Sequence, residues 1–271
     1  MDNVVTNIIE QYEIMNEDKR LEGGFGLLEK ERTKELISRY LYKEELSVLD
    51  VGGATGVYSL WLARLGYKVH LVDIVPKHVE MATQKASALE NPTLFRATVG
   101  DARNLSGIKS NSVEMVISHG PLYHLVDRKD RVKTLLEAKR VLKPGGILLA
   151  FTITRYAGIN YAIPNGLVFD DVYYSIMREE VITGECKNNP RKINTFTTAF
   201  FHLPEDIKGE IQESGLAFEK TIGILGTSWL VPELDHNWNN SEKRKRIMEI
   251  ARLLENEPVL GPRMMTVARK E

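Results

Sequence analysis

A glycine-rich turn follows a short apolar run near residue 50 and precedes a segment of helical periodicity. The turn reads Val48-Leu-Asp-Val-Gly-Gly-Ala-Thr-Gly56. Gly52 and Gly56 allow the backbone to turn tightly and to approach a ligand where a Cβ would intrude. The free amides at the start of the next helix can bind a polar or anionic group. Glycine is also the default residue of plain tight turns, so this segment alone only nominates a binding loop.

An acidic residue follows at a suggestive distance. Asp73 ends the next apolar run, 21 residues after Gly52. A carboxylate at that position can accept hydrogen bonds from a ribose diol. A surface acid or a helix cap is the alternative interpretation of Asp73. Taken together, the turn and the acid fit NAD, FAD or S-adenosylmethionine.

The elements that must position these residues alternate regularly along the chain. Short apolar runs predict strands at 46–51, 68–74, 93–98, 112–118 and 147–153. Helical spacing of apolar residues predicts helices at 4–15, 27–42, 57–65, 77–89 and 127–142. This alternation predicts an α/β protein with a Rossmann-like, doubly wound and mostly parallel sheet.

The alternation stops after Thr154. Residues 155–201 are rich in Tyr, Asn, Phe and Thr without a clear period, and we interpret them as an insertion folded over the carboxyl edge of the sheet. The pattern resumes with a helix at 204–214, a strand at 218–225, a helix at 241–255 and a strand at 264–268. The last two strands would complete a seven-stranded sheet with an antiparallel end.

The ordered motifs resemble those of the class I S-adenosylmethionine-dependent methyltransferases, whose first motif is Asp/Glu-x-Gly-x-Gly-x-Gly. Asp50 takes the acidic position of that motif, and Ala54 replaces its middle glycine. The dinucleotide pattern Gly-x-Gly-x-x-Gly is not present at this turn. The resemblance continues through Gly100-Asp-Ala102, Ser118-His-Gly-Pro-Leu-Tyr-His124 and Arg140-Val-Leu-Lys-Pro-Gly-Gly146, each at the expected strand or helix end.

Two further blocks, 120–125 and 153–156, resemble the type 11, ubiquinone/menaquinone-methyltransferase-like group within that family. With the element pattern, this divides the chain into four expected parts. They are an N-terminal helical lid (1–42), an S-adenosylmethionine-binding core (43–154), an inserted acceptor cap (155–203) and a C-terminal completion of the core sheet (204–271).

The resemblance implies S-adenosylmethionine as cofactor and S-adenosylhomocysteine as product. Asp50 would order the methionine end, and Asp101 with Ala102 would hold the adenine. Arg20 of the lid would reach the cofactor carboxylate through a charge-assisted hydrogen bond, although a solvated arginine is the alternative. The full set of expected cofactor-binding residues is Tyr12, Arg20, Asp50, Gly52, Gly53, Ala54, Gly56, Asp73, Ile74, Asp101, Ala102, Ser118 and His119.

Methyl transfer from a sulfonium is an in-line displacement that depends mainly on positioning. A general base is needed only if the nucleophile carries a proton of high pKa. His119 and His124 are the candidate catalytic bases, because both follow the fourth strand close to the expected methyl position. Structural packing is the alternative for each. The expected acceptor-binding residues are Tyr123, Tyr156, Tyr161 and His202.

The composition of the chain limits the kinds of molecule that we expect it to bind. The chain of 271 residues has a formal net charge of −1, which is unlike a dedicated nucleic-acid binder. Cys186 is the single cysteine, so no intramolecular disulfide forms, and the six histidines lack metal-ligand spacing. We expect no signal peptide, and no apolar run reaches the roughly 18 residues that are needed to span a bilayer. We expect a cytoplasmic monomer or homodimer that acts on a small-molecule acceptor, without metal, nucleic acid or membrane.

Three other functions stay open on sequence alone. A nicotinamide-dependent oxidoreductase would share the turn and the ribose acid. A non-catalytic S-adenosylmethionine-binding protein would share the whole cofactor site. A tRNA or protein methyltransferase would need a basic rim around the same site.

Overall fold

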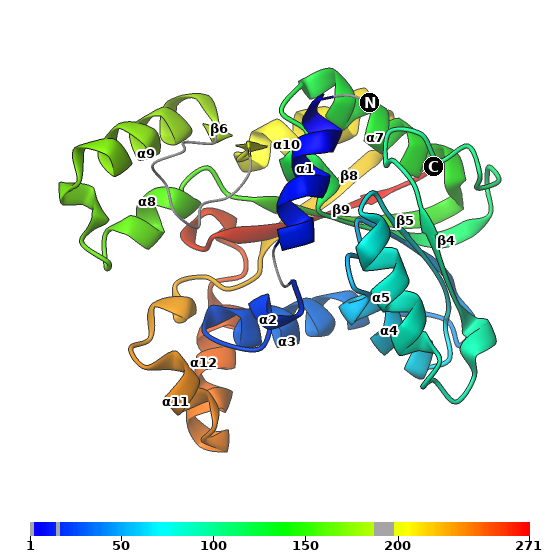
Figure 1. Cartoon of the computed structure of the whole chain (residues 1–271), viewed down its shortest axis with the longest axis horizontal. Helices are drawn as coiled ribbons and strands as arrows, with labels where there is room; N and C mark the ends of the chain where they lie inside the picture. Colours follow the sequence, from blue (N-terminus) through cyan, green and yellow to red (C-terminus); the bar gives the residue numbers. More distant parts are fainter. Residues whose placement is uncertain (1–2, 15–16, 187–197) are drawn as a thin grey trace.

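A computed structural model describes residues 3–14, 17–186 and 198–271 of the chain (Figure 1). Its centre is a seven-stranded sheet in the order β3-β2-β1-β4-β5-β9-β8. The strands are β1 (Ser47–Val51), β2 (Lys68–Asp73), β3 (Phe95–Val99), β4 (Val113–His119), β5 (Leu142–Ile153), β8 (Ala217–Gly223) and β9 (Arg263–Arg269). Strands β1 to β5 pair in parallel, and β9 runs antiparallel to both β5 and β8. The prediction of a mostly parallel sheet with an antiparallel end is therefore confirmed.

Helices cover both faces of this sheet, because successive strand residues point to opposite faces and both sets are apolar. Val48, Ile147 and Leu149 pack in one cluster with side chains of α3, α4 and α12, whereas Leu49 and Leu148 pack in a second cluster with α7 and α10. The longer helices are α1 (Asn3–Ile14), α3 (Phe25–Ser38), α4 (Val57–Arg64), α5 (Pro76–Ala86), α7 (Arg128–Val141), α9 (Asp171–Thr183), α10 (Pro204–Glu213) and α12 (Ser241–Leu253).

Several shorter helices were not expected from the sequence. They are α2 (Glu17–Arg20), α6 (Pro121–His124), α8 (Ala157–Ala162) and α11 (Leu234–Trp238), with 3-10 turns at η1 (Pro92–Leu94), η2 (Leu167–Phe169), η3 (Ser228–Leu230) and η4 (Pro258–Leu260). A helix of four to six residues is too short to show a helical period. Strand β5 also begins earlier than predicted, at Leu142, directly after helix α7.

The insertion after β5 leaves and re-enters the core at one place. Thr154 and His202 form an isolated bridge, His202 N donates to Ile153 O (2.8 Å), and Arg155 N donates to His202 O (2.9 Å). Between these ends, helices α8 and α9 and the short pair β6 (Glu185–Cys186) and β7 (Ala199–Phe200) form an arm beside the sheet (Figure 1).

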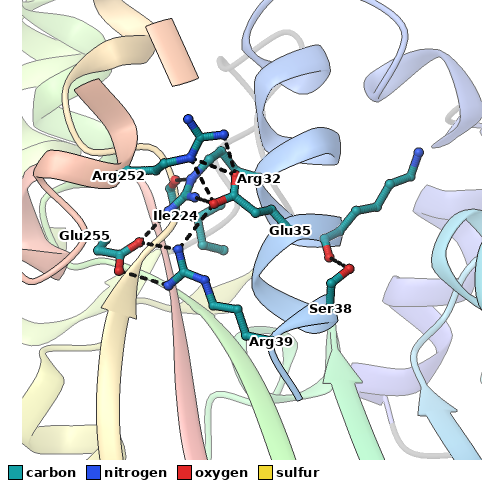
Figure 2. A network of polar contacts seen from close by, with 8 residues as sticks. Arg32, Glu35, Ser38, Arg39, Ile224, Arg252 and Glu255 are labelled. Atoms are coloured by element: carbon teal, nitrogen blue, oxygen red, sulfur yellow. Dashed lines mark hydrogen bonds and ion pairs between the residues drawn. The ribbon is translucent and has the colours of Figure 1, made fainter. Parts of the chain in front are cut away.

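A buried arginine anchors helix α3 to the C-terminal part of the chain (Figure 2). Arg32 has no exposed surface; it donates to Ile224 O (3.2 Å) and pairs with Glu255 (2.9 Å) and Glu35 (2.7 Å). Arg39 and Arg252 extend this network at the surface, to Glu255 and Glu35 respectively. This network fixes α3, which begins shortly after helix α2.

No helix in the described part of the chain combines the length and the apolar character needed to cross a membrane.

Candidate active site

A cavity of about 960 Å³, its open mouth included, lies at the carboxyl ends of β1, β2, β3 and β4. Ligands of doubly wound sheets bind at such a strand edge, where the chain connections diverge to opposite sides, here between β1 and β4. Helix α1 closes the cavity with Val5, Ile8 and Tyr12. Twelve of the predicted site residues line it: Tyr12, Arg20, Gly52, Gly53, Ala54, Asp73, Ile74, Asp101, Ala102, His119, Tyr123 and His124.

The turn after β1 needs glycine for reasons of space and of backbone conformation. Gly52 has φ 76°, and a Cβ there would lie 2.6 Å from Pro121 Cδ and 2.8 Å from His119 O. A Cβ on Gly53 would lie 2.6 Å from Asp50 Oδ2. Ala54 also has a positive φ, of 47°, although it carries a Cβ. The turn therefore holds a conformation that keeps its backbone open to the cavity.

Asp50 lies behind this turn, with no exposed surface. Ser59 Oγ donates to its Oδ2 at 2.6 Å, and its Oδ1 has no hydrogen-bond partner. Burial raises the pKa of Asp50 to about 7, although the Ser59 hydrogen bond lowers it. Gly56 and Ser118 likewise lie outside the cavity lining. These three predicted residues can support the cavity wall from behind.

Asp73 closes the turn from the end of β2. Its Oδ2 accepts from Ala54 N and its Oδ1 from Val75 N, both at 2.9 Å. Each carboxylate oxygen keeps a further lone pair, so Asp73 can still accept from a hydroxyl in the cavity. The neighbouring His78, which sequence reasoning did not single out, also lines the cavity.

The loop after β3 contributes Asp101 and Ala102. The Asp101 carboxylate accepts from the backbone and the guanidinium of Arg103, whose Nη1 in turn donates to Asp130 (2.6 Å). These bonds fix the loop, and the apolar side chains of Val72, Ile74 and Leu125 complete this wall. The wall offers an apolar slot with an acid at its edge, which suits a heteroaromatic ring.

His119 lies between two aromatic rings at the end of β4. Its imidazole stacks on Phe151 (centroids 4.4 Å apart) and on Tyr58 (5.3 Å). Neither ring nitrogen has a hydrogen-bond partner, and the residue is 6% exposed. Burial lowers the pKa of His119 to about 3, and Arg263 adds to this effect. His119 is therefore neutral at pH 7, and both packing and contact with a ligand are open to it.

His124 is tied to the lid helix. Tyr12 Oη and His124 Nε2 are 2.9 Å apart, which joins α1 to α6 across the cavity. Burial lowers the pKa of His124 to about 3, and Arg263 acts in the same direction. The two candidate bases are thus both neutral and both buried at the same end of the cavity.

A cluster of buried and partly buried charges surrounds that end. Arg20 donates to Glu17 (2.6 Å) and Glu29 (3.0 Å), and Arg263 pairs with Glu29 at 3.3 Å. Although burial raises the pKa of Glu29, the two arginines lower it to about 2. Arg263 also lies over the ring of Tyr123, with its Cζ 5.3 Å from the centroid. Sequence reasoning missed Glu17, Glu29 and Arg263, because they are far apart in the chain and belong to no motif.

Three predicted acceptor residues lie elsewhere. Tyr156, Tyr161 and His202 do not line the cavity, and no described residue of the insertion does. Tyr161 is 50% exposed on α8. His202 is fully buried beside Glu210, with Nε2 3.4 Å from Oε2. The placement expected for these residues assumed that the insertion covers the cavity, whereas its described part lies to the side.

Among the described residues, no group of three or more His, Cys, Asp or Glu side chains is arranged to hold a metal ion.

The cavity fits S-adenosylmethionine in its distribution of polar groups. Asp73 and the glycine turn could hold a ribose, and the wall beside Asp101 could hold an aromatic ring. Arg20 and Glu17 could pair with the opposite charges of an amino-acid group. The buried nitrogens of His119 lack a partner beside this region. These residues form one continuous lining.

Comparisons with known proteins agree with this fit. Residues 49–150 match the sequence family described as "Methyltransferase domain". The ubiquinone biosynthesis O-methyltransferase of Methylobacterium nodulans is 27% identical over 195 residues, which are 70% of this chain and 69% of that protein. Other curated relatives align over 30% to 63% of their own length.

Solved structures show the same fold. A SAM-dependent methyltransferase from Methanosarcina mazei superposes with a TM-score of 0.59 at 19% identity, covering 86% of this chain and 96% of that one. Magnesium protoporphyrin IX methyltransferase from Synechocystis, solved with bound SAH, gives a TM-score of 0.58 at 15% identity, covering 95% and 89%. The domain match, the relatives, the fold and the site agree: residues 49–150 form a methyltransferase domain, and the chain has the fold of the class I S-adenosylmethionine-dependent methyltransferases.

Proposed function

We propose that this enzyme transfers the methyl group of S-adenosylmethionine to an O, N or C atom of a small, aromatic or apolar acceptor. The main observation in support is that one continuous cavity extends from Asp73 to a buried end. That end is lined by Tyr12, His119, Tyr123 and His124. Aromatic walls favour a flat organic acceptor. The name of the Methylobacterium relative, an O-methyltransferase, favours oxygen as the receiving atom.

The bound cofactor supplies an activated methyl group on a sulfonium. The residues of the chain then have three tasks. The turn at Gly52 and the Asp73 carboxylate would hold the methyl donor, and helix α1 with Tyr12 would exclude water from the buried end. The rings of His119 and Tyr123 would orient the acceptor for in-line attack, where positioning contributes on the order of 7 kcal/mol or more.

Proton removal falls to His119 or His124 in this proposal. Each imidazole is neutral at pH 7, which is the form that accepts a proton, because burial lowers the pKa of each to about 3. A base of such low pKa is weak. The site therefore suits an acceptor that is already acidic, or one whose proton leaves after the methyl has been transferred.

The expected division into a lid (1–42), a core (43–154), an acceptor cap (155–203) and a completing segment (204–271) becomes part of this proposal. Residues 187–197 of the cap lie outside the described residues. We propose that the cap borders the acceptor entrance and that the lid opens for cofactor exchange.

The test is calorimetric titration of the purified protein with S-adenosylhomocysteine, with NAD and NADPH in parallel. Binding of S-adenosylhomocysteine alone supports the proposal and opens a screen of phenols, amines and carbon acids with labelled methyl transfer. Cofactor binding without turnover on any acceptor would favour a non-catalytic binding protein.

Substitution of the ribose acid gives a second check. We expect Asp73→Ala to weaken S-adenosylhomocysteine binding by about 1–3 kcal/mol, the range for a hydrogen bond to a charged group. Asp73 also holds Ala54 N and Val75 N, so the folded state of the variant must be verified by circular dichroism. Unchanged affinity in a folded variant would remove Asp73 from the cofactor site.

A further inference from the structure

His78 lines the same cavity but belongs to none of the motifs that resemble those of the methyltransferases. It is the third residue of α5 and follows Asp73 by five positions. The side chain is 3% exposed, so it faces neither solvent nor a surface groove. A buried imidazole on a cavity wall requires hydrogen-bond partners, because an unsatisfied polar group in a protein interior is costly.

Neither ring nitrogen of His78 has a hydrogen-bond partner. Its Nδ1 lies 3.4 Å from Asp73 Oδ1, which is longer than a good hydrogen bond, and Oδ1 already accepts from Val75 N. The imidazole and the carboxylate are therefore neighbours on the same wall, and the imidazole still has donor capacity to offer.

The ring is held in place from the other side by the lid. Tyr12 packs edge-on against His78, with centroids 5.4 Å apart and planes at 72°. The same tyrosine bonds His124, so one side chain of α1 contacts both histidines. An imidazole fixed in this way loses little conformational entropy when it binds a ligand.

The chemistry of Asp73 and His78 is complementary toward a hydroxyl. An ionised carboxylate only accepts hydrogen bonds, whereas a neutral imidazole offers one N–H donor. A hydroxyl can donate to the first and accept from the second. The separation of 3.4 Å allows one hydroxyl oxygen to contact both groups.

We propose that His78 is a second ribose ligand of this enzyme, donating to a cofactor hydroxyl that Asp73 accepts from. The inference rests on the proposed function, because it requires a nucleoside in the cavity. It extends recognition of the ribose from an acid alone to an acid and imidazole pair, with Tyr12 of the lid as its support.

The experiment is calorimetry with S-adenosylhomocysteine and with its 2′-deoxy and 3′-deoxy analogues. His78→Phe keeps the ring and its packing on Tyr12 but removes the donor. We expect this variant to bind S-adenosylhomocysteine about two- to tenfold more weakly, the effect of one hydrogen bond. For the deoxy analogue that lacks the contacted hydroxyl, wild type and variant should bind nearly equally.

His78→Gln, which retains an N–H donor, should recover part of the affinity and the discrimination against the deoxy analogue. If thermal unfolding shows that His78→Phe does not fold, the test is carried out with His78→Gln alone. His236→Phe, at an exposed position of helix α11, is the matched control and should change nothing.

Two results would overturn the proposal. One is wild-type affinity of His78→Phe for S-adenosylhomocysteine. The other is an equal loss of affinity for both deoxy analogues and the parent compound, which would indicate a general packing role. Failure of the wild-type protein to bind S-adenosylhomocysteine would instead contradict the proposed function itself.

Discussion

Ala54 shows what a single Cβ costs in the cofactor turn. Its φ of 47° lies in the left-handed region, where a Cβ crowds the backbone by roughly 1–2 kcal/mol. Glycine relieves that crowding but gives the unfolded chain more freedom. We expect Ala54→Gly to raise the free energy of unfolding by about 0.5–1 kcal/mol, as measured by urea denaturation.

The matched control is Ala82→Gly in the middle of helix α5, where φ is helical. There the same substitution should lower the free energy of unfolding by about 1 kcal/mol. If both variants lose stability equally, the left-handed conformation of Ala54 is not a source of strain.

His119 links stability to pH. Because its pKa is about 3 in the folded protein, against 6.5 ordinarily, the folded state stays neutral while the unfolded chain takes up a proton below pH 6.5. The contribution of His119 is therefore complete above pH 6.5 and is lost progressively as the pH falls toward 3.

We expect His119→Phe to keep the stack between Tyr58 and Phe151 and to lose less stability than wild type between pH 7.5 and pH 5. The difference should be about 1–2 kcal/mol in urea unfolding, with methyl transfer reduced in the same variant. Identical pH dependence in the two proteins would show that His119 titrates normally in the fold.

At the scale of elements, helix α1 contacts the core through buried apolar side chains and through a hydrogen bond of Tyr12. Val5 and Ile8 are buried on the cavity, and Tyr12 Oη reaches His124 Nε2. We expect Tyr12→Phe to keep the apolar contacts of Val5 and Ile8. The variant should show faster amide hydrogen exchange in residues 3–14 and bind S-adenosylhomocysteine about two- to tenfold more weakly.

Tyr42→Phe, on a half-exposed tyrosine outside the cavity, is the control and should leave exchange and binding unchanged. Exchange in α1 as slow as in wild type would show that the Tyr12–His124 hydrogen bond does not hold the helix.

The helices and strands also show which features of the fold and of the site can be predicted from the sequence. Strands such as 46–51 and 147–153 were predictable because a buried parallel strand is a continuous apolar run between turn residues. The glycine turn and Asp73 were predictable because one βαβ unit sets their spacing, whereas Asp101 was predicted from the resemblance to the methyltransferase motifs. No sequence signal pairs Glu29 with Arg263 or His78 with Tyr12, because tertiary packing alone brings these residues together.

At the scale of the whole molecule, the Arg32 network ties the N-terminal helices to the C-terminal strands and helices. We expect Arg32→Met to cost about 3 kcal/mol of unfolding free energy, because Ile224 O and two carboxylates lose a fully buried donor. Guanidinium denaturation followed by circular dichroism measures this loss.

Arg39→Ala is the control from the same network. Its side chain is 35% exposed, and surface ion pairs contribute about 1 kcal/mol or less. Equal losses in the two variants would mean that burial of Arg32 adds nothing to the attachment of α3.

The bridge between Thr154 and His202 has a consequence for how such an enzyme diversifies. Since the insertion departs from and returns to adjacent positions, its length and composition can vary without shifting any strand of the sheet. The insertion is therefore a variable segment attached to a constant sheet. Exchanging the insertion between relatives, or shortening it to a linker, would test whether it determines acceptor specificity while the affinity for the methyl donor is unchanged.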